Sequence, residues 1–139
     1  MTYEKNPVVE IGARIVYAKT ITEADVYMYA GVTGDFSPNH IDEMYMSEGH
    51  YGHRIAHGTL MMGLMSAASA RLRLGRTVSL GYDRVRFTGP VFFGDTISTT
   101  YTLTRIDREK RRAYADVECV NQHGKVVAVA TNVRAWVDQ

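Results

Sequence analysis

The sequence predicts an α+β fold in which one antiparallel β-sheet curls around a single buried helix. A proline-free, largely apolar stretch spans residues 58–74, and the segments after it alternate apolar with polar residues. Short polar turns separate these segments, and such an order of elements is typical of α+β architecture. The 139 residues fit one domain, so we expect a single domain spanning residues 1–139.

Composition narrows the class of partner. Sixteen basic and fifteen acidic side chains give a net charge of +1, which provides no overall attraction for nucleic acid or an anionic membrane. The longest apolar stretch, Leu60–Ala70, is shorter than the ~20 residues of a membrane span. Cys119 is the single cysteine and cannot form an internal disulfide, so we expect a reducing, cytoplasmic location.

The first third of the chain predicts a strand and two helices. Ala13–Thr20 is rich in β-branched and aromatic residues, which favours an opening strand. Thr22 and Asp25 have the spacing of a capping box, so a helix is expected from there to Gly34. After a loop of turn-forming residues, a short helix is expected within Ile41–Glu48.

The long helix is expected to organise the fold. Gly58–Leu74 runs 17 residues and stops at Gly75, which corresponds to a length of about 25 Å at 1.5 Å per residue. Apolar or small residues surround its first three turns. A helix without a polar face is buried on most sides.

Alternation with a period of two predicts the strands that follow. The set Val78, Leu80 and Tyr82 changes phase near Asp83, which indicates a bulge. Three later alternating sets run from Ile97 to Leu103, from Ala113 to Cys119 and from Val127 to Val137. Polar turns at residues 107–110 and 121–124 predict hairpins, so we expect about four strands in a meander. A sheet with open edges favours association of two copies, as a homodimer or a dimer of dimers.

Two polar residues of the first loop suggest acid–base chemistry. Asp35 and His40 are five residues apart, and Pro38 restricts the backbone between them. A carboxylate and an imidazole that converge on one water molecule can activate it. From spacing alone a structural alternative stays open, in which Asp35 caps a turn and His40 caps the next helix.

Three segments carry a resemblance to a known family. They are Thr33–Asp42 (TGDFSPNHID), Ile55–Leu60 (IAHGTL) and Val85–Asp95 (VRFTGPVFFGD). Together they resemble the MaoC-like hydratase and dehydratase family of the hot-dog fold, including the short enzymes that make (R)-3-hydroxyacyl-CoA. The resemblance extends from about Ile21 to Ile97 and implies an antiparallel sheet wrapped around a long central helix.

The resemblance also implies a reaction. In that family the loop aspartate and histidine hold the reacting water, so Asp35 and His40 take these roles by position. Water would add to a trans-2-enoyl-CoA, with hydroxyl to C3 and a proton to C2, giving the (R)-3-hydroxyacyl-CoA reversibly. Coenzyme A enters as part of the acyl-CoA substrate, so no cofactor is expected. Acyl length, the physiological direction, and the choice between coenzyme A and acyl carrier protein stay open.

Gly58 is a third candidate catalytic residue, and Ser66, Arg84 and Arg86 are candidate substrate contacts. Gly58 would place backbone N–H donors of the helix start near the thioester oxygen, although a glycine also permits tight helix entry. Ser66 matches a serine near the site of related hydratases, with close packing of the helix as the alternative. Arg84 and Arg86 share a strand face and are candidates for the phosphates of coenzyme A, or for a solvated surface.

A metal site is not expected. His50, His53 and His57 have spacings of three and four, but Gly49 and Gly52 interrupt the helix that would align them. We expect His57 to support the start of the long helix instead.

The sequence leaves three alternatives to a hydratase. Hot-dog thioesterases and the fatty-acid dehydratases that act on carrier protein typically place an acidic residue in the central helix, whereas Gly58–Leu74 contains none. A non-catalytic acyl-thioester binding domain would not need both Asp35 and His40. Hydration is therefore the favoured reaction.

Overall fold

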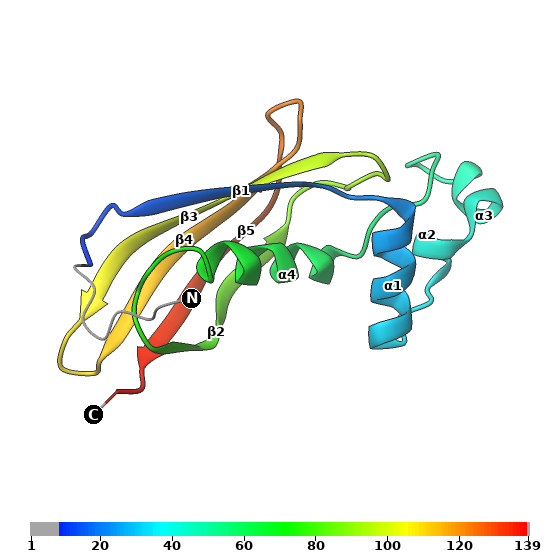
Figure 1. The fold of residues 1–139 in the computed structure, drawn as a ribbon. Helices are drawn as coiled ribbons and strands as arrows, with labels where there is room; N and C mark the ends of the chain where they lie inside the picture. The colour runs from blue at the N-terminus through cyan, green and yellow to red at the C-terminus, as the bar shows by residue number, and fades with distance from the viewer. Residues whose placement is uncertain (1–8, 139) are drawn as a thin grey trace.

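The computed structural model describes residues 9–138, which form one sheet and four helices (Figure 1). The ends of the predicted domain, residues 1–8 and 139, lie outside the described residues. The strands are β1 (Arg14–Thr20), β2 (Thr77–Phe87), β3 (Thr96–Asp107), β4 (Arg112–Val120) and β5 (Val126–Trp136). The helices are α1 (Glu23–Thr33), α2 (Pro38–Ile41), α3 (Glu43–Ser47) and α4 (Gly58–Ser69).

The sheet is antiparallel and packs around α4, as predicted. Its strand order is β1-β3-β4-β5-β2, and every neighbouring pair is antiparallel. Helix α4 lies along one face of the sheet, and α1, α2 and α3 gather beyond the start of α4 (Figure 1). The side chains of Met61, Met65 and Ala68 enter the same core as Ile97 and Tyr101. This architecture is the hot-dog fold.

Helix α1 begins and ends where local capping predicts. The Thr22 hydroxyl accepts the N–H of Asp25, and the Asp25 carboxylate accepts the N–H of Thr22, which completes the capping box. At the other end Gly34 takes a left-handed φ of 83°, and its N–H donates to Ala30. The chain therefore leaves α1 at a defined angle just before Asp35.

Helix α4 is shorter than predicted and has one open face. It ends at Ser69 rather than Leu74, because the chain turns to bury Leu74 against Leu103 in a second small core cluster. The Trp136 indole N–H donates to the carbonyl of Leu74 at 2.6 Å and holds the turn in place. Within the described chain Thr59, Gly63 and Ser66 are exposed, so α4 is not buried on all sides.

The pairing of β2 differs from the predicted meander. Strands β3, β4 and β5 are joined by the two expected hairpins, but β2 pairs with β5 instead of β3. Edge strands are therefore β1 and β2. The predicted bulge is confirmed by a register shift between Asp83 and Arg86, where Arg84 has a φ of 55°.

The valine set of β5 does not form the inner face. Ala128 and Ala130 belong to the core, and the carbonyl oxygen of the Asn132 side chain accepts the Tyr101 hydroxyl. A register shift opposite Cys119 and Val120 breaks the alternation, so Val127 alone of the predicted set joins the main core. The strand stops at Trp136, before Val137. None of the helices within residues 9–138 has the length and apolarity of a membrane span.

Candidate active site

The first site residues lie where α1 gives way to α2. Asp35 follows the left-handed Gly34, and Pro38 begins the single turn of α2. The sequence predicted that His40 belongs to the loop. The structure places it in α2 instead. Its side chain is buried, whereas the Asp35 side chain is 44% exposed.

The two oxygens of the Asp35 carboxylate have different neighbours, Ser37 and His40. Oδ1 accepts the backbone N–H of Ser37 at 3.1 Å and the Ser37 hydroxyl at 2.5 Å, and these bonds hold the pKa of Asp35 below its usual value. Oδ2 lies 3.9 Å from Nε2 of His40. That separation is too long for a direct hydrogen bond and suits one bridging water molecule.

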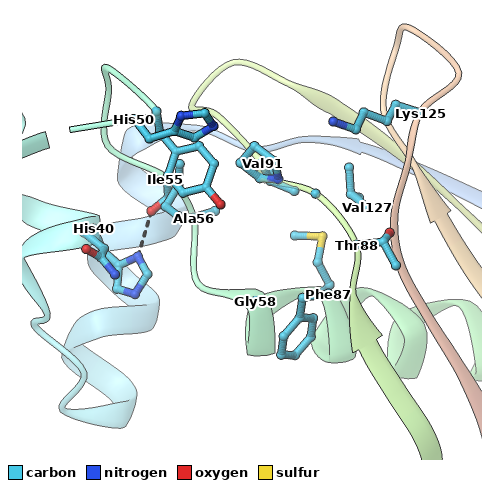
Figure 2. A pocket seen from close by; sticks show the side chains of 15 residues that line it. His40, His50, Ile55, Ala56, Gly58, Phe87, Thr88, Val91, Lys125 and Val127 are labelled. Atoms are coloured by element: carbon cyan, nitrogen blue, oxygen red, sulfur yellow. Dashed lines mark hydrogen bonds between the residues drawn. The ribbon is translucent and has the colours of Figure 1, made fainter. Parts of the chain in front are cut away.

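The ring of His40 is oriented by a backbone carbonyl. Nδ1 lies 2.7 Å from the carbonyl oxygen of Ile55, as Figure 2 shows. A carbonyl only accepts, so Nδ1 carries the hydrogen and Nε2 is the ring nitrogen that faces Asp35. The predicted alternative, in which His40 caps the next helix, is wrong, because Asp42 accepts the Tyr45 N–H at the start of α3.

His57 connects the site to the long helix. Its Nε2 lies 2.9 Å from the backbone carbonyl of Asp35, and its ring stacks on the His40 ring at 3.7 Å between centroids. Tyr29 makes an edge contact with the same ring at 4.7 Å. The side chain is almost fully buried, and burial lowers the pKa of His57, so the ring is neutral and donates through Nε2.

Gly58 begins α4 beside His57. A helix leaves its first N–H groups without intrahelical partners, and the His57 side chain does not cap them. A β carbon at Gly58 would lie 2.8 Å from Cδ2 of Phe87, so the aromatic ring itself requires a glycine at this position. This contact could not be predicted from the sequence, because the two residues are far apart in the chain.

A cavity of about 520 Å³ adjoins these groups (Figure 2). His40 and Gly58 both line it, together with Met61 of α4 and Phe87 of β2. Its size falls within the range of ~300–1,000 Å³ that is usual for small-molecule sites. The structure therefore brings two of the three predicted catalytic residues to one cavity, with Asp35 at the side of His40.

The predicted substrate-binding residues lie elsewhere. Ser66 is on the open face of α4 and does not line this cavity. Arg84 lines a second hollow with Asp116 and Thr131 on the face of the sheet that points away from α4. Arg86 pairs with Val129, which lines the same hollow, so both arginines face away from Asp35 and His40.

The three histidines with spacings of three and four, His50, His53 and His57, have separate surroundings. His53 contacts Glu43 at 3.1 Å, and His50 packs on Tyr51. Within the described residues, the side chains that offer metal-ligand atoms within 4.8 Å of one another are Asp35, His40 and His57. One ring nitrogen of each of these histidines already donates to a carbonyl.

A sheet wrapped around a helix, with a carboxylate and an imidazole beside the helix start, is typical of hot-dog hydratases and dehydratases. Comparisons with known proteins agree. Residues 8–127 match the family model described as the MaoC like domain, and the chain belongs to this MaoC-like family. It is an enzyme of the hydro-lyase type.

Individual relatives and structures support this assignment. An (R)-specific enoyl-CoA hydratase of Rhodospirillum rubrum is 36% identical over 110 residues, which cover 79% of this chain and 76% of that protein. A 3-hydroxybutyryl-CoA dehydratase of Methylorubrum extorquens is 31% identical, with 79% and 70% covered. The R-hydratase PhaJ1 of Pseudomonas aeruginosa superimposes with a TM-score of 0.85 at 32% identity, covering 94% of this chain and 84% of that one.

Replacing Gly58 is expected to destabilise the fold through Phe87. The Gly58→Ala variant should lose about 1–3 kcal/mol of unfolding free energy in urea titrations, because its β carbon overlaps the aromatic ring. In a Phe87→Ala background the same change should cost little. Gly31→Ala in α1 is the control, since a β carbon there meets open space and should be neutral or stabilising. Equal costs of Gly58→Ala in both backgrounds would contradict the contact.

His57 is expected to make the fold sensitive to acid. Burial holds the folded pKa of His57 below the usual value of 6.5, so the native state binds fewer protons than the unfolded state at acidic pH. The stability from neutral His57 is present above about pH 6.5 and is lost as pH falls below it. In denaturant titrations between pH 7 and 5, His57→Gln should flatten this dependence. His123→Gln, in an exposed turn, should leave it unchanged, and an unaltered slope in His57→Gln would refute the assignment.

Proposed function

We propose that this protein catalyses the reversible, (R)-specific hydration of trans-2-enoyl-CoA to (R)-3-hydroxyacyl-CoA. The observation that carries the proposal is the 3.9 Å gap between the Asp35 carboxylate and Nε2 of His40, beside the start of α4. The named activities of the Rhodospirillum rubrum and Methylorubrum extorquens relatives support the same chemistry.

Asp35 and His40 would hold the attacking water. The Ser37 hydrogen bonds lower the pKa of Asp35 and keep its carboxylate ionised at neutral pH. The water donates one hydrogen bond to Oδ2 of Asp35 and one to Nε2 of His40, which leaves its lone pairs free. Its oxygen bonds to C3 while Asp35 takes the proton, and the C2=C3 electrons move onto the thioester oxygen.

The start of α4 would stabilise the charge that develops. The unpaired N–H of Gly58 and the positive end of the helix dipole favour the enolate oxygen. The enolate then collapses, and C2 takes the proton back from Asp35 on the same face. One water is added in a syn sense with no change in electron count, so the step needs neither a redox cofactor nor a metal ion.

A thioesterase is the main competing function. As in the sequence, α4 contains no Asp or Glu between Gly58 and Ser69, so the acidic residue typical of those enzymes is missing from the described helix. A thioesterase would release free coenzyme A, whereas a hydratase keeps the thioester bond intact. A non-catalytic binding domain would do neither.

Loss of either site residue is expected to remove most activity. Purified protein mixed with crotonyl-CoA should consume the conjugated enoyl absorbance and give the (R)-3-hydroxy product on chiral analysis. Asp35→Asn and His40→Ala should each lower turnover by at least ~10²-fold, the usual scale for a lost general base or acid. Thiol release without hydration would favour the thioesterase, and an (S)-product would contradict the proposal.

Two controls make this assay specific. Asp42→Asn alters a nearby carboxylate that caps α3 and does not line the cavity, so it should retain turnover. Dialysis against a chelator should leave the wild-type rate unchanged, because no step needs a metal. A loss of activity that added zinc restores would overturn the metal-free mechanism.

We also propose that a second copy of the chain covers β2 and the open face of α4. Val78 and Leu80 of the edge strand β2 are 46% and 51% exposed, and unpaired edge strands readily pair with another chain. The adjoining face of α4, with Gly63 and Ser66, is also uncovered in the single chain. A homodimer, or a dimer of such dimers, would bury both surfaces.

Light scattering after size-exclusion chromatography is expected to give at least twice the monomer mass. Val78→Lys should shift the protein towards monomer, because a charge would enter the paired edge. Val16→Lys is the matched control, since Val16 is 47% exposed on β1, the opposite edge. Equal effects of the two substitutions would exclude β2 as the interface.

A further inference from the structure

We propose that the cavity beside His40 and Gly58 receives the phosphopantetheine arm of the thioester, and that Lys125 and His50 bind its phosphate. This inference rests on the proposed function, since it concerns the carrier attached to the same thioester. It replaces Arg84 and Arg86, the phosphate contacts suggested by the sequence, with residues that share a cavity with the catalytic groups.

The cavity extends from the catalytic groups to Lys125. In Figure 2, His40 and Gly58 lie on one side and Lys125 on the other, with its ammonium turned towards the interior and His50 at the upper rim. If the thioester carbonyl binds at Gly58, the attached phosphopantetheine arm can therefore extend through the cavity towards Lys125. Neutral polar side chains of Asn39, Tyr51 and Thr88 line the path and can hydrogen-bond to the amides of the arm.

The charge of this cavity suits an anion. None of the fifteen described residues that line it is Asp or Glu. Within residues 9–138, no carboxylate lies within salt-bridge distance of the Lys125 ammonium, and His50 makes only a ring contact with Tyr51. A phosphate would thus meet an unpaired lysine and an imidazole N–H that can donate a hydrogen bond to it.

The base of the Lys125 side chain is held by its neighbours. The Asn121 side-chain oxygen accepts the N–H of Lys125 at 3.0 Å, and the Asn121 N–H donates to the Lys125 carbonyl at 2.9 Å. The lysine stem lies against Gly89, where a β carbon would be 3.1 Å from its Cε. The Thr88 hydroxyl and N–H donate to backbone carbonyls at the start of β5. These bonds hold the segment of Thr88 and Gly89 beside Lys125.

The second hollow, which contains Arg84, is a poorer phosphate site. It has a similar volume of about 520 Å³, but Asp116 and Glu118 also line it and oppose its two arginines in charge. It opens on the face of the sheet that points away from α4, and no catalytic residue lines it. A thioester at Gly58 would have to cross the sheet to reach it.

The test compares substrates with and without the phosphate. Lys125→Glu should raise KM for crotonyl-CoA by roughly tenfold, the scale of a lost charge-assisted hydrogen bond, with kcat nearly unchanged. KM for the crotonyl thioester of N-acetylcysteamine, which has no phosphate, should stay within twofold of the wild-type value. Lys110→Glu, the same charge change in the β3–β4 turn, and Arg84→Gln should leave both KM values unchanged.

Crotonyl-acyl carrier protein separates the two sources of phosphate. The arm carries one phosphate in both carriers, so Lys125→Glu should raise KM for this substrate as well. An effect confined to crotonyl-CoA would place the contact on its nucleotide and overturn the assignment. An equal rise with N-acetylcysteamine would also overturn it, because the phosphate would then play no part.

The same assays separate failure of the proposed function from failure of this inference. If the wild-type protein hydrates none of the three thioesters, the proposed function fails. If it hydrates them and Lys125→Glu has no effect, only this inference fails.

Discussion

The site depends on one buried histidine. His57 donates from Nε2 to the backbone of Asp35, stacks on His40 and stands immediately before Gly58. The carboxylate, the imidazole and the helix start come from three different segments, and this ring contacts or adjoins all of them. Its neutral state, favoured by burial, keeps a positive charge away from the stacked His40. The spacing between Asp35 and His40 therefore follows from the packing of His57 against both residues.

The fold places this cluster at the start of α4, where the first backbone N–H groups have no partners within the helix. Helix α4 is covered on one face by the sheet, and its N-terminus points towards the segment of α1, α2 and α3 (Figure 1). Free N–H groups at a helix start are useful only where a substrate can approach closely. At Gly58 no side chain stands beside the N–H, and the ring of Phe87 fills the position that a β carbon would take. The packing of Phe87 and the close approach of a substrate thus both require a residue without a side chain at position 58.

Charge distinguishes the cavity beside His40 from the second hollow, which contains Arg84. In the second hollow, Asp116 and Glu118 lie beside Arg14 and Arg84 and offset the attraction of these arginines for an anion. In the cavity beside His40 and Gly58, Lys125 has no acidic neighbour among the lining residues. Counting basic residues along the chain could not reveal this difference, because arginine is frequent near β2 whereas the uncompensated lysine comes from the β4–β5 turn.

Much of this protein follows from local sequence. The capping box at Thr22, the hairpin turns and the alternation in β3 and β4 were predictable because they depend on residues close together in the chain. Asp35 and His40 were identifiable as a pair from their spacing and the family resemblance. Only the tertiary structure decided that β2 pairs with β5, that α4 ends early to bury Leu74, and that Arg84 and Arg86 face away from the site. The sequence predicted that His57 supports the start of α4, and the structure added its contacts with Asp35 and His40. These features depend on contacts between distant residues, whose free energies outweigh the local preferences that a sequence pattern records.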